Sequence, residues 1–182
     1  MYSKSILRIP AGWTALLLLV LPLWLASCKK ENDVTSPNSA EGSWRINALR
    51  FDPAFDLFDI GVPTSDAVAT LKQVATQFPE YADDVTCFTE TRYTFNSNGS
   101  VAVAESPKCA SSADFENLNP VDNTAKWKVE NNKITLTDAS GSETYDFSRN
   151  GDTMNWSVKE TDDFDGDGKT ETVTLTLEFK KI

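Results

Sequence analysis

The stretch that decides the fold is residues 126–147, which read KWKVENNKITLTDASGSETYDF. Apolar residues alternate there with Thr, Lys, Asp and Glu, and the pairs Asn131-Asn132 and Ser140-Gly141 interrupt the alternation. A period of two with one apolar face is typical of antiparallel strands that bury one side. Asn and Gly tolerate positive φ and favour tight hairpins. The stretch therefore predicts three strands joined by hairpins, at 124–130, 133–138 and 142–149.

The same alternation continues on both sides of this stretch. The further apolar positions are Trp44 and Ile46, Tyr93 and Phe95, Val101 and Val103, Met154, Trp156 and Val158, and Val173, Leu175, Leu177 and Phe179. They predict five more strands, at 43–51, 86–96, 100–105, 153–161 and 170–181. Eight strands favour an all-β fold, an eight-stranded antiparallel up-and-down barrel, because closure removes exposed edges. A two-sheet sandwich is the alternative.

One short helix is predicted between the first two strands, at about 65–77. Thr64 or Ser65 can cap it and Pro79 ends it. Its apolar stripe is Val68, Leu71, Val74 and Phe78. The loop before it carries three phenylalanines, at 51, 55 and 58, which would either plug the barrel end or form a lip around a binding mouth.

The cysteines fit the second predicted hairpin. A three-residue loop at 97–99, with Gly99 in the left-handed conformation, pairs residues whose numbers sum to 196. Cys87 and Cys109 satisfy this sum, so they would face each other near the open end of the hairpin. In an exported chain such a pair predicts a disulfide. Two reactive thiols are the alternative.

The N-terminus has the pattern of an export signal. Lys4 and Arg8 precede an apolar run at 13–26 that contains Pro22 and is shorter than the roughly 20 residues that a spanning helix needs. An uncleaved membrane anchor is the alternative. The run ends in Leu25-Ala26-Ser27-Cys28, which resembles the lipobox of bacterial lipoproteins. The resemblance implies cleavage before Cys28 and acyl chains on Cys28 that anchor the protein in a membrane.

These features divide the chain into a signal peptide at 1–27, a flexible tether at 28–41 and a barrel domain at 42–182. Removing residues 1–27 from the 182 leaves 155, and the net charge changes from −10 to −12 because Lys4 and Arg8 are lost. So acidic a chain repels phosphate backbones, and we expect no nucleic-acid binding. We expect a monomeric outer membrane lipoprotein, on the periplasmic face or the cell surface.

Two segments of the domain resemble the lipocalins. Gly42-Ser43-Trp44 resembles their Gly-x-Trp opening, and Trp127-Lys128-Val129-Glu130-Asn131-Asn132 resembles a strand of small bacterial lipocalin-like lipoproteins. The resemblance covers residues 42–182. It implies that Trp44 closes the barrel floor beneath an arginine, which the sequence does not identify. The Thr-Asp-Tyr motif of lipocalins has no clear counterpart.

The resemblance implies that the barrel binds a small apolar ligand or lipid. The aromatic candidates for this role are Trp44, Phe55, Phe58, Tyr93, Trp127 and Trp156. Alternatively, these side chains fill the core of a solid barrel. The protein would then be a surface interaction module whose loops at 51–63, 106–123 and 162–169 contact a protein, a glycan or calcium.

The last of these loops carries a possible calcium site. Its Asp-x-Asp-x-Asp-Gly spacing is typical of calcium loops, in which carboxylates and a backbone carbonyl converge on one cation. The candidate ligands are Asp163, Asp165, Asp167, Lys169 through its carbonyl, and Glu171. Thr174 takes the place of the bidentate glutamate and strands flank the loop, so it is not an EF-hand. A polar hairpin loop without calcium is the alternative.

The chain contains no histidine. This excludes histidine acid–base chemistry, Ser-His-Asp and Cys-His nucleophiles, and zinc sites with histidine ligands. No pair of carboxylates is singled out for glycoside cleavage. We therefore do not expect an enzyme.

Overall fold

The computed structural model describes residues 39–56, 62–111, 119–164 and 168–182. The predicted signal peptide, the lipid-attachment residue Cys28 and most of the predicted tether lie outside these residues. So do Phe58, Asp165 and Asp167.

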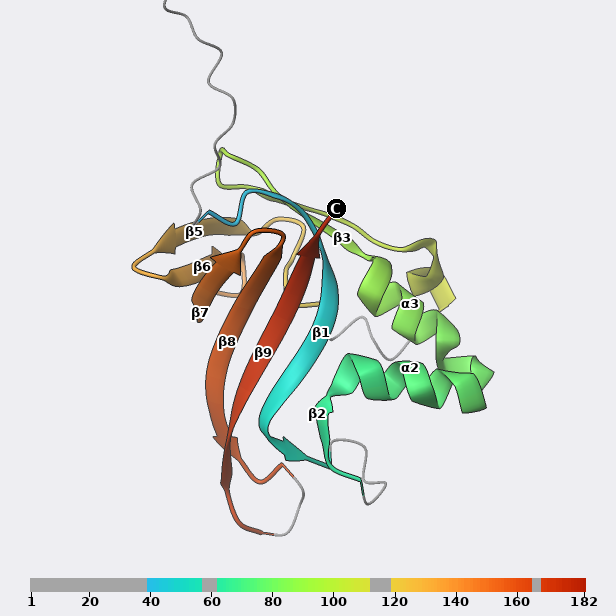
Figure 1. Ribbon diagram of the computed structural model, residues 1–182. Coiled ribbons are helices and arrows are strands. Elements are labelled where there is room, and N and C mark those ends of the chain that lie inside the picture. The colour runs from blue at the N-terminus through green and yellow to red at the C-terminus, as the bar shows by residue number, and fades with distance from the viewer. Residues whose placement is uncertain (1–38, 57–61, 112–118, 165–167) are drawn as a thin grey trace, which may run out of the picture. The chain divides into compact units, whose positions relative to one another are not determined.

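Eight antiparallel strands form a nearly closed barrel, in the order β4-β3-β1-β9-β8-β7-β6-β5 (Figure 1). Their bounds are β1 (Gly42–Phe55), β3 (Arg92–Phe95), β4 (Val101–Ala104), β5 (Lys126–Glu130), β6 (Lys133–Thr137), β7 (Ser142–Asn150), β8 (Thr153–Asp162) and β9 (Glu171–Lys181). A short additional strand, β2 (Thr64–Asp66), pairs with β1. The predicted eight-stranded antiparallel barrel is confirmed.

The barrel closes where β4 meets β5. Ser100 and Lys126 form an isolated antiparallel bridge. Two backbone hydrogen bonds flank it, from the Val101 amide to the Ala125 carbonyl (3.0 Å) and from the Trp127 amide to the Gly99 carbonyl (2.8 Å). The contact is shorter than the ladders between the other strands, so the seam is the least paired part of the wall.

Two α-helices lie between β1 and β3, where the sequence predicts one. The helix α2 (Ala67–Gln77) is the predicted one, but Asp66 caps it in place of Thr64 or Ser65, and its Oδ1 accepts from the Ala69 amide at 3.1 Å. Its stripe of apolar residues ends before Phe78, which is 50 % exposed because the chain turns there into the 3-10 helix η2 (Pro79–Tyr81).

The second helix, α3 (Ala82–Glu90), corrects the prediction of a strand at 86–96, since β3 begins only at Arg92. Val85 and Phe88, one helical turn apart, are both buried. Threonines favour strands, which explains the error, but the hydroxyl groups of Thr86 and Thr89 donate to backbone carbonyls one turn back in the helix.

The hairpin register is as predicted, although Cys87 is not part of it. Arg92 pairs with Ala104 and Phe95 with Val101, so paired residue numbers sum to 196. The disulfide between Cys87 and Cys109 is present, with 4.7 Å between the Cα atoms. It joins α3 to the 3-10 helix η3 (Pro107–Ser111), beyond the ends of the two strands.

The core lies inside the barrel and is rich in aromatic residues. Its largest fully buried side chains are Trp44, Trp156, Tyr93, Phe95, Phe179, Ile134 and Met154. A smaller cluster around Phe51, Ala67 and Val173 fills the space beneath α2. None of the helices among the described residues is long and apolar enough to cross a membrane.

Candidate functional site

One end of the barrel is sealed around Trp44. This side chain is fully buried, and its Nε1 donates to the Ala40 carbonyl at 2.7 Å. The Arg149 guanidinium lies 5.0 Å from the centroid of the Trp44 ring. Its nitrogens donate to the carbonyls of Ser39 (2.7 Å) and Gly151 (3.1 Å). We call Trp44, Arg149 and the backbone at 39–41 the sealed end.

Arg149 is the arginine that the lipocalin resemblance implied and the sequence did not identify. Alternation could have found it, because Tyr145, Phe147 and Arg149 follow one another at every second position of β7 and Phe147 is buried. A cation over an aromatic face, with its donors satisfied, stabilises the fold without requiring a ligand.

Next to the sealed end, aromatic rings fill the barrel. Trp156 packs against Phe179 at 4.5 Å between centroids and against Phe95 at 5.5 Å, and Tyr93 meets Phe179 at 5.9 Å. Tyr93 and Trp156 are each 1 % exposed. Of the predicted ligand-binding residues, Trp44, Tyr93 and Trp156 thus lie in the packed core.

Two further aromatic candidates are only partly buried. Trp127 packs edge-on against Phe95 at 5.8 Å, and its Nε1 donates to the Asn96 carbonyl at 3.1 Å. Phe55 lies far from it, between Phe51 (4.7 Å) and Phe164 (5.3 Å). The structure therefore divides the aromatic candidates between the barrel core and the separate cluster beneath α2.

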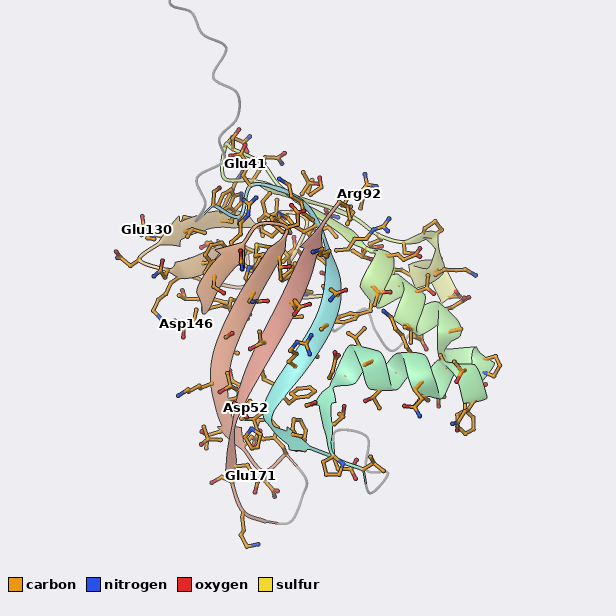
Figure 2. All side chains as sticks on the ribbon, in the orientation of Figure 1. Glu41, Asp52, Arg92, Glu130, Asp146 and Glu171 are labelled. Carbon is orange, nitrogen blue, oxygen red and sulfur yellow. A yellow bond between two sulfur atoms is a disulfide. The ribbon has the colours of Figure 1, made fainter. Side chains whose placement is uncertain are left out.

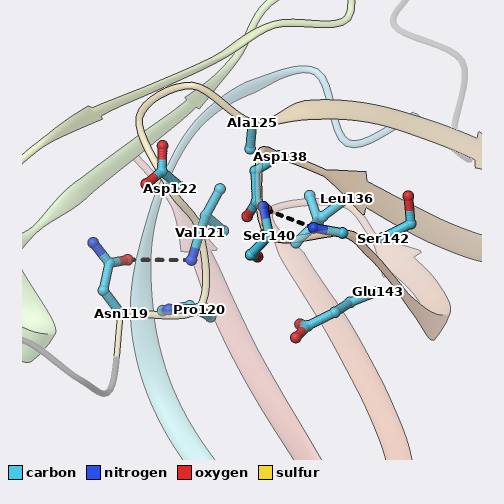
Figure 3. A pocket seen from close by; sticks show the side chains of 11 residues that line it. Asn119, Pro120, Val121, Asp122, Ala125, Leu136, Asp138, Ser140, Ser142 and Glu143 are labelled. Carbon is cyan, nitrogen blue, oxygen red and sulfur yellow. Dashed lines mark hydrogen bonds between the residues drawn. The ribbon is translucent and has the colours of Figure 1, made fainter.

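A cavity of about 580 Å³ lies between residues 119–125 and the turn that joins β6 to β7. Figure 3 shows its lining side chains, with Glu143 extending from β7 toward the segment that carries Pro120. Its apolar lining residues are Pro120, Val121, Ala125 and Leu136, and its polar ones are Asn119, Asp122, Asp138, Ser140, Ser142 and Glu143, with Gly141 at the turn. We call this cavity and its lining the mouth.

The apolar wall of the mouth is part of the barrel core. Val121, Ala125 and Leu136 are at most 5 % exposed and belong to the same cluster as Trp44. The mouth and Arg149 lie at opposite ends of β7, which begins at Ser142 and ends at Asn150. A volume of this size is in the range of small-molecule sites.

The rim of the mouth carries three carboxylates. Oδ1 of Asp138 accepts from the amides of Ser140 (2.7 Å) and Gly141 (3.2 Å), and Oδ1 of Asp122 accepts from the Thr124 amide and hydroxyl, both at 2.6 Å. Hydrogen bonds from Ser140 lower the pKa of Asp138, and those from Thr124 lower the pKa of Asp122. Both side chains are therefore charged at neutral pH.

The third carboxylate, Glu143, is tied to the aromatic interior. It accepts a hydrogen bond from the Tyr145 hydroxyl, and the Tyr145 ring stacks on Trp156 at 5.9 Å between centroids. Burial raises the pKa of Tyr145, and the bond to Glu143 raises it further. Tyr145 thus stays protonated and keeps donating to Glu143.

The predicted calcium loop is only partly described. Oδ2 of Asp163 accepts from the Gly168 amide at 2.9 Å, and Glu171 accepts from the Phe164 amide at 3.3 Å. Oδ1 of Asp163 is buried and has no hydrogen-bond partner. Within the part of the chain that the structure describes, no three His, Cys, Asp or Glu side chains are grouped as metal ligands. Calcium binding stays a prediction.

A nearly closed antiparallel barrel with one sealed end and a cavity at the other is typical of proteins that hold a small ligand. Residues 41–156, more than half of the chain, match the family model for the lipocalin-like domain, and the chain belongs to this family. No curated protein and no solved structure matches the chain. The match confirms the lipocalin-like resemblance, and the family is in general a binding fold rather than an enzyme.

Sequence reasoning missed the mouth. Alternation identifies Leu136 as an inner residue, but Val121 and Ala125 lie on a connection without periodic pattern. Asp122 and Asp138 each have the short spacing to Thr or Ser that marks an Asx turn. The turns could have been found from the sequence, whereas their meeting around one cavity depends on the tertiary fold.

Proposed function

We propose that this protein is a membrane-anchored lipocalin-like lipoprotein that binds a small ligand with an apolar body in the mouth. The single observation that carries the proposal is the 580 Å³ cavity whose inner wall consists of core residues such as Val121 and Leu136. Val121 and Leu136 are already at most 5 % exposed, so hydrophobic contact with a ligand, at about 25 cal/mol for each Å² removed from water, would supply only a small part of the binding free energy.

The anchor is the second part of the proposal. The lipobox at 25–28 supports acylation of Cys28 and attachment to the outer membrane, on its periplasmic face or at the cell surface. Metabolic labelling with an alkyne-tagged fatty acid tests it. We expect label on the wild-type chain and none on Cys28→Ser; equal labelling of the two would contradict the anchor.

Native mass spectrometry of the full chain, released from detergent micelles, tests the bound ligand. We expect a second population, heavier than the acylated chain by the mass of one small molecule. Leu136→Glu, which places a charge on the apolar wall, should abolish that population. Thr135→Glu, on the neighbouring and less buried position of β6, is the matched control and should retain it. A wild-type chain that carries no ligand and takes up none would contradict the proposal.

Calcium binding by the acidic loop is a second candidate function. The observation that favours it is the buried and unpartnered Oδ1 of Asp163, since such an oxygen is costly without a donor or a cation. Calorimetry at millimolar calcium should detect heat with the wild-type chain and less with Asp163→Asn. An absence of heat with the wild-type chain would contradict the site.

A further inference from the structure

The mouth contains both an apolar wall and an excess of negative charge, and the two together restrict the ligand. Asp122, Asp138 and Glu143 line the cavity, and none of the lining residues that the structure describes is a lysine or an arginine. Most of the described lining residues are polar, and the apolar ones are Pro120, Val121, Ala125 and Leu136. The three carboxylates would repel an anionic ligand such as a fatty acid.

The carboxylates are not neutralised by their neighbours. One oxygen of Asp122 and one of Asp138 are used in turns, and neither residue forms a salt bridge with any described residue. One oxygen of Glu143 accepts from Tyr145, which is a neutral donor. The negative charge of Asp138 also raises the pKa of Asp122, against the larger lowering by Thr124, so these two carboxylates are close enough to repel each other.

Lys126 directly follows the lining residue Ala125 and is the lysine nearest to the mouth along the chain; it is exposed and alternates with the partly buried Trp127. Lys128 pairs with Glu130 at 3.0 Å, and Lys133 pairs with Asp146 at 2.7 Å. Figure 2 shows Glu130 and Asp146 on the outside of β5–β7. Lys128 and Lys133 alternate along their strands with the inward residues Val129 and Ile134. The positive charges of these lysines therefore lie on the outer face of the sheet, across from the mouth.

From this arrangement we infer that the ligand is a cationic amphiphile, namely a primary amine on an apolar chain or ring. This inference rests on the proposed function and deepens it. The apolar body contacts Val121 and Leu136 while the ammonium group lies at the rim, where it relieves the repulsion between Asp122 and Asp138. The three donors of an ammonium group match the acceptor oxygens that the turns leave unused. A charge-assisted hydrogen bond of this kind is stronger than a neutral one.

Three octyl compounds test the inference, because octylamine, octanol and octanoate share one chain and differ in the charge of the head. Calorimetric titration of the purified full chain in a nonionic detergent at pH 7 gives the dissociation constants, with titration into empty micelles subtracted. We expect octylamine to bind at least about tenfold more tightly than octanol, and octanoate to bind most weakly. One nearby charge contributes about 1 kcal/mol at a solvated rim, which is roughly a fivefold change in affinity.

Substitutions at the rim test whether its carboxylates cause the preference for octylamine over octanol. Glu143→Gln and Asp138→Asn keep the acceptor oxygens that Tyr145 and the turn amides use, and each should weaken octylamine binding about fivefold while leaving octanol unchanged. Asp152→Asn is the matched control, because it removes one exposed carboxylate from the β7–β8 turn at the other end of β7. It should leave all three affinities unchanged. Unfolding midpoints equal to that of the wild type show that each variant is folded.

The possible outcomes separate the two proposals. If none of the three compounds binds, the proposed function fails. If octanol and octanoate bind as tightly as octylamine, the barrel binds ligands but the inference fails. Dihexanoyl phosphatidylethanolamine, in which a phosphate accompanies the ammonium group, distinguishes a free amine from a lipid headgroup. Binding of this lipid more tightly than octylamine would assign the ammonium site to the headgroup.

Discussion

The two ends of the barrel differ in the charge of their polar residues and in how those residues are paired: Arg149 lies at the sealed end, and acidic side chains line the mouth. At the sealed end, the indole and guanidinium groups of Trp44 and Arg149 donate to backbone carbonyls, and the Trp44 side chain is fully buried. At the mouth, Asp122, Asp138 and Glu143 line a cavity whose described lining residues include no lysine or arginine. The polar groups of Trp44 and Arg149 are thus hydrogen-bonded within the fold, whereas the carboxylates of the mouth still have acceptor oxygens that a ligand could use. Stability and binding should therefore respond to different residues.

Trp44→Ala should have the largest effect on stability. The substitution removes a fully buried indole, its hydrogen bond to Ala40 and the face on which Arg149 lies. Removal of a buried tryptophan typically costs about 3–5 kcal/mol. Denaturant unfolding of the variant measures the loss. Trp127→Ala, at a half-buried position, should cost less, and an equal cost at the two positions would contradict the deeper burial of Trp44.

Removal of the disulfide should cause the second largest loss of stability. The disulfide lies at neither the sealed end nor the mouth. Cys87 and Cys109 close a loop with a sequence separation of 22. A loop of this length stabilises by about 3 kcal/mol, through restriction of the unfolded chain. The double variant Cys87→Ala/Cys109→Ala should show this loss in denaturant unfolding and keep its affinity for octylamine. A changed affinity with unchanged stability would show that the bridge acts on the mouth and not on the fold.

Tyr93 should make the core sensitive to alkaline pH. Burial raises the pKa of its hydroxyl well above the ordinary value of 10, and the charge of Glu105 raises it further. Above pH 10 the unfolded chain loses this proton while the folded chain keeps it. The stabilisation is complete below pH 10 and decreases above it, by about 1.4 kcal/mol for each pH unit.

Tyr93→Phe should therefore flatten the decline of the unfolding free energy between pH 10 and 11.5. Tyr81→Phe, which removes a hydroxyl that is largely exposed, is the control and should leave the slope as in the wild type. Equal slopes for Tyr93→Phe and the wild type would show that the hydroxyl is not buried as described.

The carboxylates of the mouth should have the smallest effect on stability. Asp138→Asn retains an oxygen for the amides of Ser140 and Gly141, so the turn should persist. We expect the free energy of unfolding to change little, as for most surface substitutions. Thermal unfolding measures it. A loss as large as that of Trp44→Ala would show that the charge of Asp138 stabilises the fold and is not available to a ligand.

Much of the barrel could be predicted from the sequence because each strand is locally consistent. Asn131 and Asn132 both adopt positive φ, at 52° and 58°, as the turn between 124–130 and 133–138 requires. The error at 86–90 arose because threonines favour strands, whereas the burial of Val85 and Phe88 and the bridge to Cys109 make this segment a helix. Burial and the disulfide are tertiary features, and the local sequence pattern does not indicate them.

The candidate site was less predictable than the fold. Aromatic residues drew attention as ligand contacts, yet Trp44, Tyr93 and Trp156 fill the core. The cavity is lined mainly by small and acidic residues that no motif connects, from 119–125 and from the turn after β6. Their proximity follows from the path of the connection between β4 and β5, which sequence periodicity does not specify.

The most direct test of the account compares one variant from each end in two measurements. Arg149→Met should lower the free energy of unfolding by about 1–2 kcal/mol, through loss of the cation–π contact and two hydrogen bonds, and should leave octylamine affinity unchanged. Glu143→Gln should weaken octylamine binding about fivefold and leave the free energy of unfolding unchanged. If instead both variants move both quantities by similar amounts, stability and binding are not divided between the two ends, and the account is contradicted.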